Sequence, residues 1–143
     1  MSERPSPRPR DHYRHFVPQT TRWSDNDAYG HVNNSVHYLW FDSAVNRWMI
    51  EAGLLDIYGD PIGLVVETGC RYFAPLAYPA PIEVGLRVAR LGSSSVTWHL
   101  GVFGEGQENP ASEGHFTHVI VDAATRRPVP MPDAWRTAYE TLA

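Results

Sequence analysis

The chain has 143 residues and a mass of 16.1 kDa, the size of one ordinary globular domain. Its 43% hydrophobic and 20% charged residues exclude a disordered or fibrous protein, and a formal net charge of −4 argues against a nucleic-acid partner. The single cysteine, Cys70, cannot form an internal disulfide. The sequence has neither an apolar export signal nor an apolar run of about 18 residues, so a cytoplasmic protein without a membrane partner is expected.

Residues 1–12 are expected to form a flexible N-terminal arm, because this stretch is rich in proline, serine and arginine and has almost nothing to bury. Residues 13–143 are expected to form a single domain. Its first segment, Tyr13–Trp23, predicts a strand in which Pro18 indicates a sheet edge or a bulge. The following Ser24–Asn34 is dense in Asp, Asn and Gly, which is typical of a shaped loop.

A long amphipathic helix is predicted over Ser35–Ala52. Asn33, Asn34 or Ser35 can cap its start, and Gly53 can close its end. The apolar stripe is too broad for a surface helix, so the helix needs a large partner such as a sheet. The residues of this stripe recur at steps of three and four: Val36, Leu39, Trp40, Ala44, Val45, Trp48, Met49 and Ala52.

After the helix, the pattern changes to short segments rich in Val, Ile, Phe and Thr, which predict antiparallel strands separated by breaks at hairpin-like spacing. A short terminal helix is predicted over Pro132–Leu142. The fold class is therefore α+β, with one antiparallel sheet wrapped around the long helix. The predicted strands are Gly63–Phe73, Ile82–Leu91, Ser95–Phe103 and Gly114–Asp122, and the breaks are YPAP, LGSS, GEGQENP and ATRRP.

The run WSDNDAYGHVNNSVHYLWF, Trp23–Phe41, resembles the active-site loop and helix start of hotdog-fold acyl-CoA thioesterases of the 4-hydroxybenzoyl-CoA thioesterase type. Weaker similarities follow at Arg71–Leu76, Val88–Ser95 and His118–Pro130. The resemblance implies the hotdog fold and hydrolysis of an acyl-CoA thioester to a free acid and coenzyme A. It implies no cofactor.

Thioester hydrolysis needs a nucleophile or a base that activates water, together with donors for the oxygen that gains negative charge. By resemblance, Asp27 is the catalytic carboxylate, acting as nucleophile or as general base. Asp25 stands two residues earlier, and spacing alone does not rank the two. The looser family pattern keeps only the Asp four residues before His31, which favours Asp27 and leaves Asp25 a structural part. Without the resemblance, both would be interpreted as residues of an Asp-rich turn.

The family places an oxyanion donor at the first helical turn, and the matching group is the backbone N–H of Asn34 or a neighbour. The side chains of Asn33 and Asn34 are equally suited to plain helix capping. His31 has either a proton-transfer role or that of a hydrogen-bonded loop residue. Beside Asn33 and His31, the expected substrate-binding residues are Tyr29, Tyr38 and Ser94. The tyrosines are expected for an acyl pocket. Ser94 belongs to a serine run that first indicates a hairpin turn and that, by weak resemblance, implies a contact with coenzyme A.

No metal site is predicted, because six residues on a helix place His31 and His37 on different faces. Cys70 lacks a nucleophile motif and is expected to be a buried thiol. Arginines suit the phosphates of coenzyme A, although each of them is better explained as a solvated surface residue. These arginines are Arg87, Arg90, Arg126 and Arg127.

An open sheet edge has unpaired backbone groups, so a homodimer is expected, with a homotetramer as the larger possibility. Two alternatives to an acyl-CoA thioesterase remain open from the sequence. One is a thioesterase that acts on acyl carrier protein, and the other is a hotdog module that binds acyl-CoA without hydrolysing it.

Overall fold

Within residues 5–143, which this computed structural model describes, five strands form one antiparallel sheet in the order β1-β3-β4-β5-β2. Two α-helices and two short 3-10 helices complete this part of the chain. The strands are β1 (His15–Gln19), β2 (Ile62–Tyr72), β3 (Ile82–Leu91), β4 (Ser95–Gly104) and β5 (Ser112–Val121). The helices are η1 (Arg10–His12), η2 (Trp23–Asp25), α1 (Asn34–Glu51) and α2 (Asp133–Glu140).

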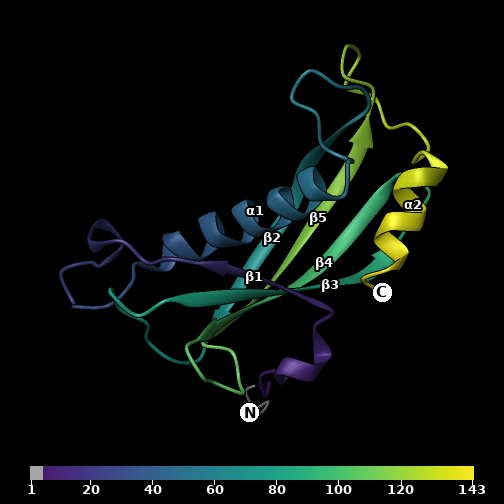
Figure 1. The fold of residues 1–143 in the computed structure, drawn as a ribbon. Coiled ribbons are helices and arrows are strands. Elements are labelled where there is room, and N and C mark those ends of the chain that lie inside the picture. The colour runs from purple at the N-terminus through teal and green to yellow at the C-terminus, as the bar shows by residue number, and fades with distance from the viewer. Residues whose placement is uncertain (1–4) are drawn as a thin grey trace.

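Helix α1 lies against one face of the sheet, which curves around it, and α2 packs at one end (Figure 1). The core forms between α1 and the inward-facing residues of the strands, such as Val84, Leu86 and Trp98. Leu39, expected in the buried stripe, is instead 56% exposed, because it lies on the side of α1 opposite the buried residues. The α+β class and the sheet around one long helix are confirmed. The buried residues of α1 are Val36, His37, Trp40, Phe41, Ala44, Val45, Trp48 and Met49.

The ends of α1 follow the predicted capping chemistry. Asn33 is the N-cap, and its side-chain oxygen accepts hydrogen bonds from the backbone N–H of Ser35 at 2.9 Å and from its hydroxyl at 2.7 Å. Gly53 follows the helix with φ of +78°, a conformation that glycine adopts without steric cost. The helix therefore begins at Asn34, immediately after the Asp-rich loop.

The predicted hairpin at YPAP is wrong. Strand β2 pairs with β5, and β3 pairs with β4 and β1, so residues 73–81 cross between separate parts of the sheet. The prolines of this segment indicate where a strand stops, but they carry no information on which strand is its neighbour. This crossover leaves β2 as an edge strand.

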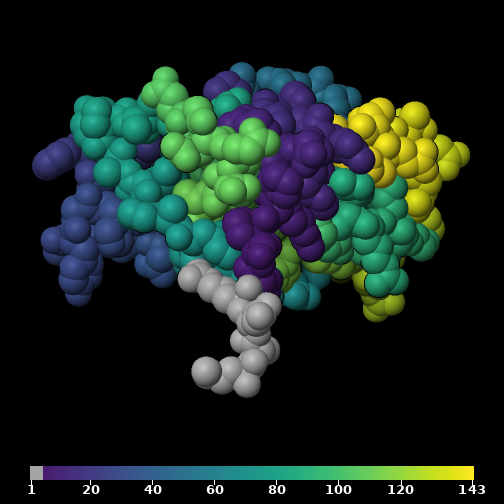
Figure 2. Space-filling view, turned by 90° about the horizontal axis from the view of Figure 1, so that it is seen from below, coloured from purple at the N-terminus to yellow at the C-terminus, as the bar shows by residue number. Residues whose placement is uncertain are grey.

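The other edge strand is β1, and Pro18 lies within it, as the missing backbone donor of proline predicts. The chain before β1 contacts the sheet instead of extending freely. The backbone N–H of Arg8 donates to the Glu113 carboxylate at 2.9 Å, and Arg10 forms an ion pair with Glu83 at 3.0 Å. Figure 2 shows this N-terminal segment in purple, against the teal and green parts of the chain. Residues 1–4 of the expected arm lie outside the described residues.

Glycine at position 114 gives Phe41 its space in the core. A Cβ at Gly114 would overlap the ring edge of Phe41, whose Cζ lies 2.7 Å from that position, and Phe41 is fully buried. We expect Gly114→Ala to lower the free energy of unfolding by about 1–3 kcal/mol, the usual cost of overpacking. Urea unfolding measures the loss. Gly63→Ala is the control, because its Cβ would meet no atom closer than 3.4 Å, and an equal loss in both variants would contradict the explanation.

Candidate active-site groove

The loop between η2 and α1 folds back on itself through its own backbone. Gly30, with φ of +82°, donates its N–H to the carbonyl of Asp27 at 3.1 Å, and Asp27 donates its N–H to the carbonyl of His31 at 2.9 Å. Asn26 and Val32 form an isolated antiparallel bridge beneath this turn. The dense Asp, Asn and Gly composition thus builds a tight turn that presents Asp27 just before α1.

Asp27 lines a groove of about 590 Å³. Its Oδ1 accepts a hydrogen bond from the backbone N–H of Tyr29 at 2.8 Å, which is the local turn contact expected of an Asp-rich loop. Its Oδ2 has no hydrogen-bond partner among residues 5–143. One oxygen therefore orients the carboxylate while the other stays available to a ligand.

Asp25 is in a different environment, because its side chain is only 1% exposed. Its carboxylate accepts hydrogen bonds from the backbone N–H of Arg22 at 2.8 Å and from the Arg22 guanidinium at 3.1 Å. Its carbonyl accepts from the backbone N–H of Asn33 at 2.9 Å. Asp25 thus connects η2 to the residue that caps α1, and it does not line the groove.

The first turn of α1 forms another part of the groove wall. The backbone N–H of Asn34 has no acceptor among the described residues, as is common at a helix start. The carbonyl of Asn34 accepts a hydrogen bond of 2.7 Å from the Tyr72 hydroxyl. Burial raises the pKa of Tyr72, so its phenol stays protonated and remains a donor. Asp27 and Asn34, the residues that carry this carboxylate and this N–H, therefore line the same groove.

Comparison with known proteins assigns the chain to a family. Residues 21–138, which include the groove loop, match the model of the thioesterase-like superfamily. The chain belongs to this superfamily. It is a thioester hydrolase by that membership, and its sheet and helix have the hotdog arrangement that the sequence motif implies.

Solved structures share the fold of this chain. The PA5185 protein of Pseudomonas aeruginosa is 53% identical, covers 96% of each chain and superimposes with a TM-score of 0.92. Slr0204, a 1,4-dihydroxy-2-naphthoyl-CoA thioesterase from Synechocystis, shares the fold with a TM-score of 0.79, 18% identity, and coverage of 87% of this chain and 93% of its own. The uncharacterized protein YsmA of Bacillus subtilis is 24% identical over 107 residues, 74% of this chain and 69% of its own.

The structure brings some of the predicted site residues together and leaves others apart. Tyr29, which is 86% exposed, stacks on His31, and both residues line the same groove as Asp27. Tyr38 instead packs edge-on against a core ring of α1. Ser94 lies in the hairpin between β3 and β4, where its carbonyl accepts from a backbone N–H of β5. Neither lines the groove within one copy of the chain, so their roles stay predictions.

The groove also contains residues that sequence reasoning did not single out. His37 was considered only as a metal ligand, yet its ring lines the groove. The opposite wall is the end of β2 and the segment after it, Tyr72–Leu76, which the family resemblance touched without assigning a function. The backbone N–H of Val32 donates to the carbonyl of Leu76 at 2.7 Å, so the two walls are joined by a hydrogen bond.

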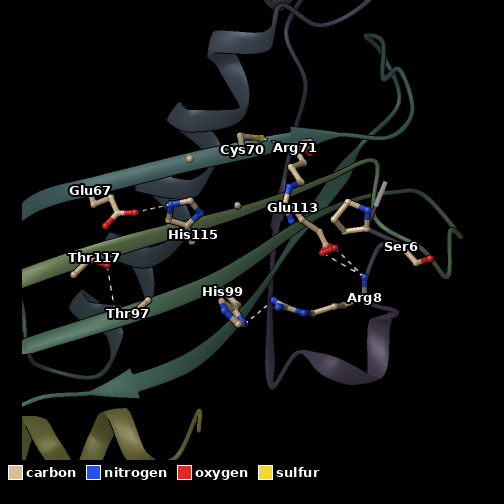
Figure 3. Close-up of a pocket in the computed structure, with 13 residues that line it drawn as sticks. Ser6, Arg8, Glu67, Cys70, Arg71, Thr97, His99, Glu113, His115 and Thr117 are labelled. Carbon is tan, nitrogen blue, oxygen red and sulfur yellow. Dashed lines mark hydrogen bonds and ion pairs between the residues drawn. The ribbon is translucent and has the colours of Figure 1, made fainter. Parts of the chain in front are cut away.

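A second cavity of about 620 Å³ lies on the face of the sheet that points away from α1 (Figure 3). It shares no lining residue with the groove. Its titratable groups largely pair with each other: the Nδ1 of His99 with the Arg8 guanidinium at 2.7 Å, and the Nε2 of His115 with Glu67 at 3.1 Å. The Arg8 contact attaches the N-terminal segment to β4, the Glu67 contact joins β2 to β5, and neither involves the groove loop.

Residues 5–143 show no sign of a metal site or of a membrane-spanning helix. No three His, Cys, Asp or Glu side chains gather closely enough there to hold a metal ion. Neither of the two α-helices in this part of the chain is long and apolar enough to cross a membrane.

Proposed function

We propose that the protein hydrolyses acyl-CoA thioesters in the groove at the start of α1. The observation that carries this proposal is the shared groove wall: it contains both Asp27 and Asn34, and within residues 5–143 Oδ2 of Asp27 and the backbone N–H of Asn34 have no hydrogen-bond partner. Asp27 supplies the negative oxygen that the reaction needs. The Asn34 N–H, with the partial positive charge of the helix start, stabilises the oxygen that becomes negative.

The carboxylate has two routes to the same products. In the first, Oδ2 of Asp27 attacks the thioester carbonyl carbon, the C–S bond breaks, and coenzyme A leaves as its thiolate; water then hydrolyses the mixed anhydride to the free acid. In the second, Asp27 takes a proton from water as the water oxygen attacks the same carbon; the C–S bond breaks, and the departing thiolate takes the proton from Asp27. A burst of thiol in the first turnover supports the anhydride route, and its absence supports the general-base route.

Coenzyme A is the favoured carrier because the loop motif resembles that of acyl-CoA thioesterases, and because a structural neighbour bears that activity in its name. The test is release of free thiol from a panel of short, long and aryl acyl-CoAs and from the same acyl groups on acyl carrier protein. Faster turnover of the carrier-protein substrates would show that acyl carrier protein, and not coenzyme A, carries the acyl group. Saturable binding of acyl-CoA without thiol release would favour a non-catalytic binding module.

The edge strand β2 supports a homodimer as the active form. It is an edge strand of 11 residues, and Val65 and Val66 in its middle are 45% and 60% exposed. An open edge of this length with apolar side chains favours pairing with a second copy. The far end of β2 enters the groove wall at Tyr72, so a partner on this edge lies close to the site.

The dimer prediction is checked by the mass of the protein in solution. Sedimentation equilibrium is expected to give twice the 16.1 kDa of one chain, or four times for a tetramer. Replacing Val66 with Lys puts a charge on the open edge and is expected to shift the equilibrium toward the monomer. A wild-type protein that sediments as a monomer at micromolar concentration contradicts the prediction.

A further inference from the structure

The imidazole of His37 lies in the wall of the Asp27 groove, and the proposed reaction gives it no task. His37 is the fourth residue of α1 and is 3% exposed. Long helical side chains lean toward the N-terminal end of their helix, so this ring lies over the turn that begins at Asn34. Both residues line the groove.

The His37 ring is held in a fixed orientation. Its Nδ1 lies 2.7 Å from the hydroxyl oxygen of Ser112, a fully buried residue at the start of β5. The ring packs edge-on against Tyr72 at a centroid distance of 5.0 Å and tilted against Trp40 at 5.1 Å. An imidazole fixed on three sides presents its remaining nitrogen in one direction.

That remaining nitrogen, Nε2, is open to the groove. It has no hydrogen-bond partner among residues 5–143. It is also absent from the set of unpaired polar atoms that are closed off from solvent in this part of the chain, which are Tyr13 OH, Trp98 Nε1 and His118 Nδ1. Because His37 is otherwise buried and lines the groove, the groove is where solvent, or a substrate, reaches Nε2.

The chemistry of a neutral imidazole selects the partner. Burial lowers the pKa of His37 to about 4, so the ring is neutral near pH 7 and carries one donor and one acceptor nitrogen. The Ser112 hydroxyl can donate to Nδ1 or accept from it, so this contact is compatible with either tautomer. A hydroxyl group both donates and accepts, and so pairs with Nε2 in either tautomer. A plain hydrocarbon would displace water from Nε2 and leave it unpaired, which is costly.

We propose that His37 is a specificity-determining residue, whose Nε2 selects acyl groups that carry a hydroxyl within reach over acyl groups that do not. This inference rests on the proposed thioesterase function and adds the chemical class of its substrate. Ser112 is the positioning residue, because it fixes the ring through Nδ1 without facing the groove itself.

The first test uses the wild-type protein and needs no variant. We expect kcat/KM for the best hydroxylated substrate to exceed that of its plain counterpart about tenfold or more, within pairs such as 3-hydroxybutanoyl-CoA and butanoyl-CoA or hydroxybenzoyl-CoA and benzoyl-CoA. Turnover with no preference in any pair overturns this inference and leaves the proposed function standing. No turnover of any thioester overturns both.

A pair of variants then separates Nε2 from the rest of the ring. In His37→Asn the amide ends near the position of Nδ1, whereas in His37→Gln it extends to the position of Nε2. Both variants lose the ring contacts with Tyr72 and Trp40, so their structural damage is matched. We expect the hydroxyl preference to persist in His37→Gln and to fall about tenfold in His37→Asn. Equal preferences in the two variants would overturn the role of Nε2.

His118→Gln is the control for the loss of any buried histidine. His118 is 4% exposed on β5 and does not line the groove. We expect this variant to keep the wild-type hydroxyl preference even where it changes stability. A changed preference in His118→Gln would mean that packing, and not Nε2, determines the choice of acyl group.

Discussion

Asp27→Asn is expected to lower kcat/KM for acyl-CoA hydrolysis by at least about a hundredfold. The amide keeps the size of the side chain and its Oδ1 contact with the backbone N–H of Tyr29, so the turn has no reason to unfold. What it removes is the negative oxygen that attacks the thioester or takes the proton from water. The measurement is thiol release under saturating and limiting substrate, with circular dichroism and sedimentation to show an unchanged fold and mass.

Asp25→Asn is the matched control, because it makes the same chemical change two residues away. The Asp25 carboxylate is buried and paired with Arg22, so its replacement is expected to lower stability while the folded protein keeps its activity to within about tenfold. The two aspartates are thereby separated by what they affect. If kcat/KM fell less than tenfold in Asp27→Asn, or more than tenfold in Asp25→Asn, Asp27 would not be the catalytic carboxylate.

Stability is expected to fall steeply between about pH 6.5 and pH 4. Burial lowers the pKa of His37 and of His118 to about 4, below the value of 6.5 that they have when exposed. In this pH window the unfolded chain binds protons that the folded chain does not, so acid favours unfolding, and above about pH 6.5 the effect is absent. Each histidine accounts for about 3 kcal/mol at the acid end of the window. Urea unfolding at fixed protein concentration measures this slope.

His118→Leu provides the check on this mechanism. The Nδ1 of His118 is buried without a hydrogen-bond partner in the described part of the chain, so an apolar replacement removes an unsatisfied polar group as well as the titration. We expect the variant to be at least as stable as wild type at pH 5 and to show a shallower acid slope. An unchanged slope would assign the acid sensitivity to other groups, such as the partly exposed His99, whose pKa burial and then Arg8 lower to about 4.

Local features of the fold could be predicted from the sequence, and long-range ones could not. The period of α1, its Asn33 cap and the left-handed Gly53 all follow from interactions between residues close in the chain. The pairing of β2 with β5 does not, because it depends on which strand buries the inner face of β2, and no turn motif records that choice. Arg8 was likewise assigned to a flexible arm, since composition does not reveal a carboxylate on β5 that accepts its backbone N–H.

The same distinction applies to the site. The loop motif singled out Asp27 and the backbone of Asn34, which lie close in the chain and line one groove. His37 was missed because its value depends on Ser112, 75 residues away, which fixes Nδ1 and leaves Nε2 facing the groove. The function of a residue that depends on a partner distant in the sequence can be recognised only in the folded structure.

The hydrogen bond from Tyr72 to the carbonyl of Asn34 links the open edge strand to the first turn of α1. A second copy that pairs with β2 would restrict the motion of this strand, which ends at Tyr72. It would thereby also restrict the motion of the first turn of α1, which Tyr72 contacts. Assembly and turnover would then be coupled through this hydrogen bond. Dissociation of the subunits on dilution would make the first turn of α1 more mobile. It would then lower the activity even though every residue in the proposed chemistry belongs to the same chain.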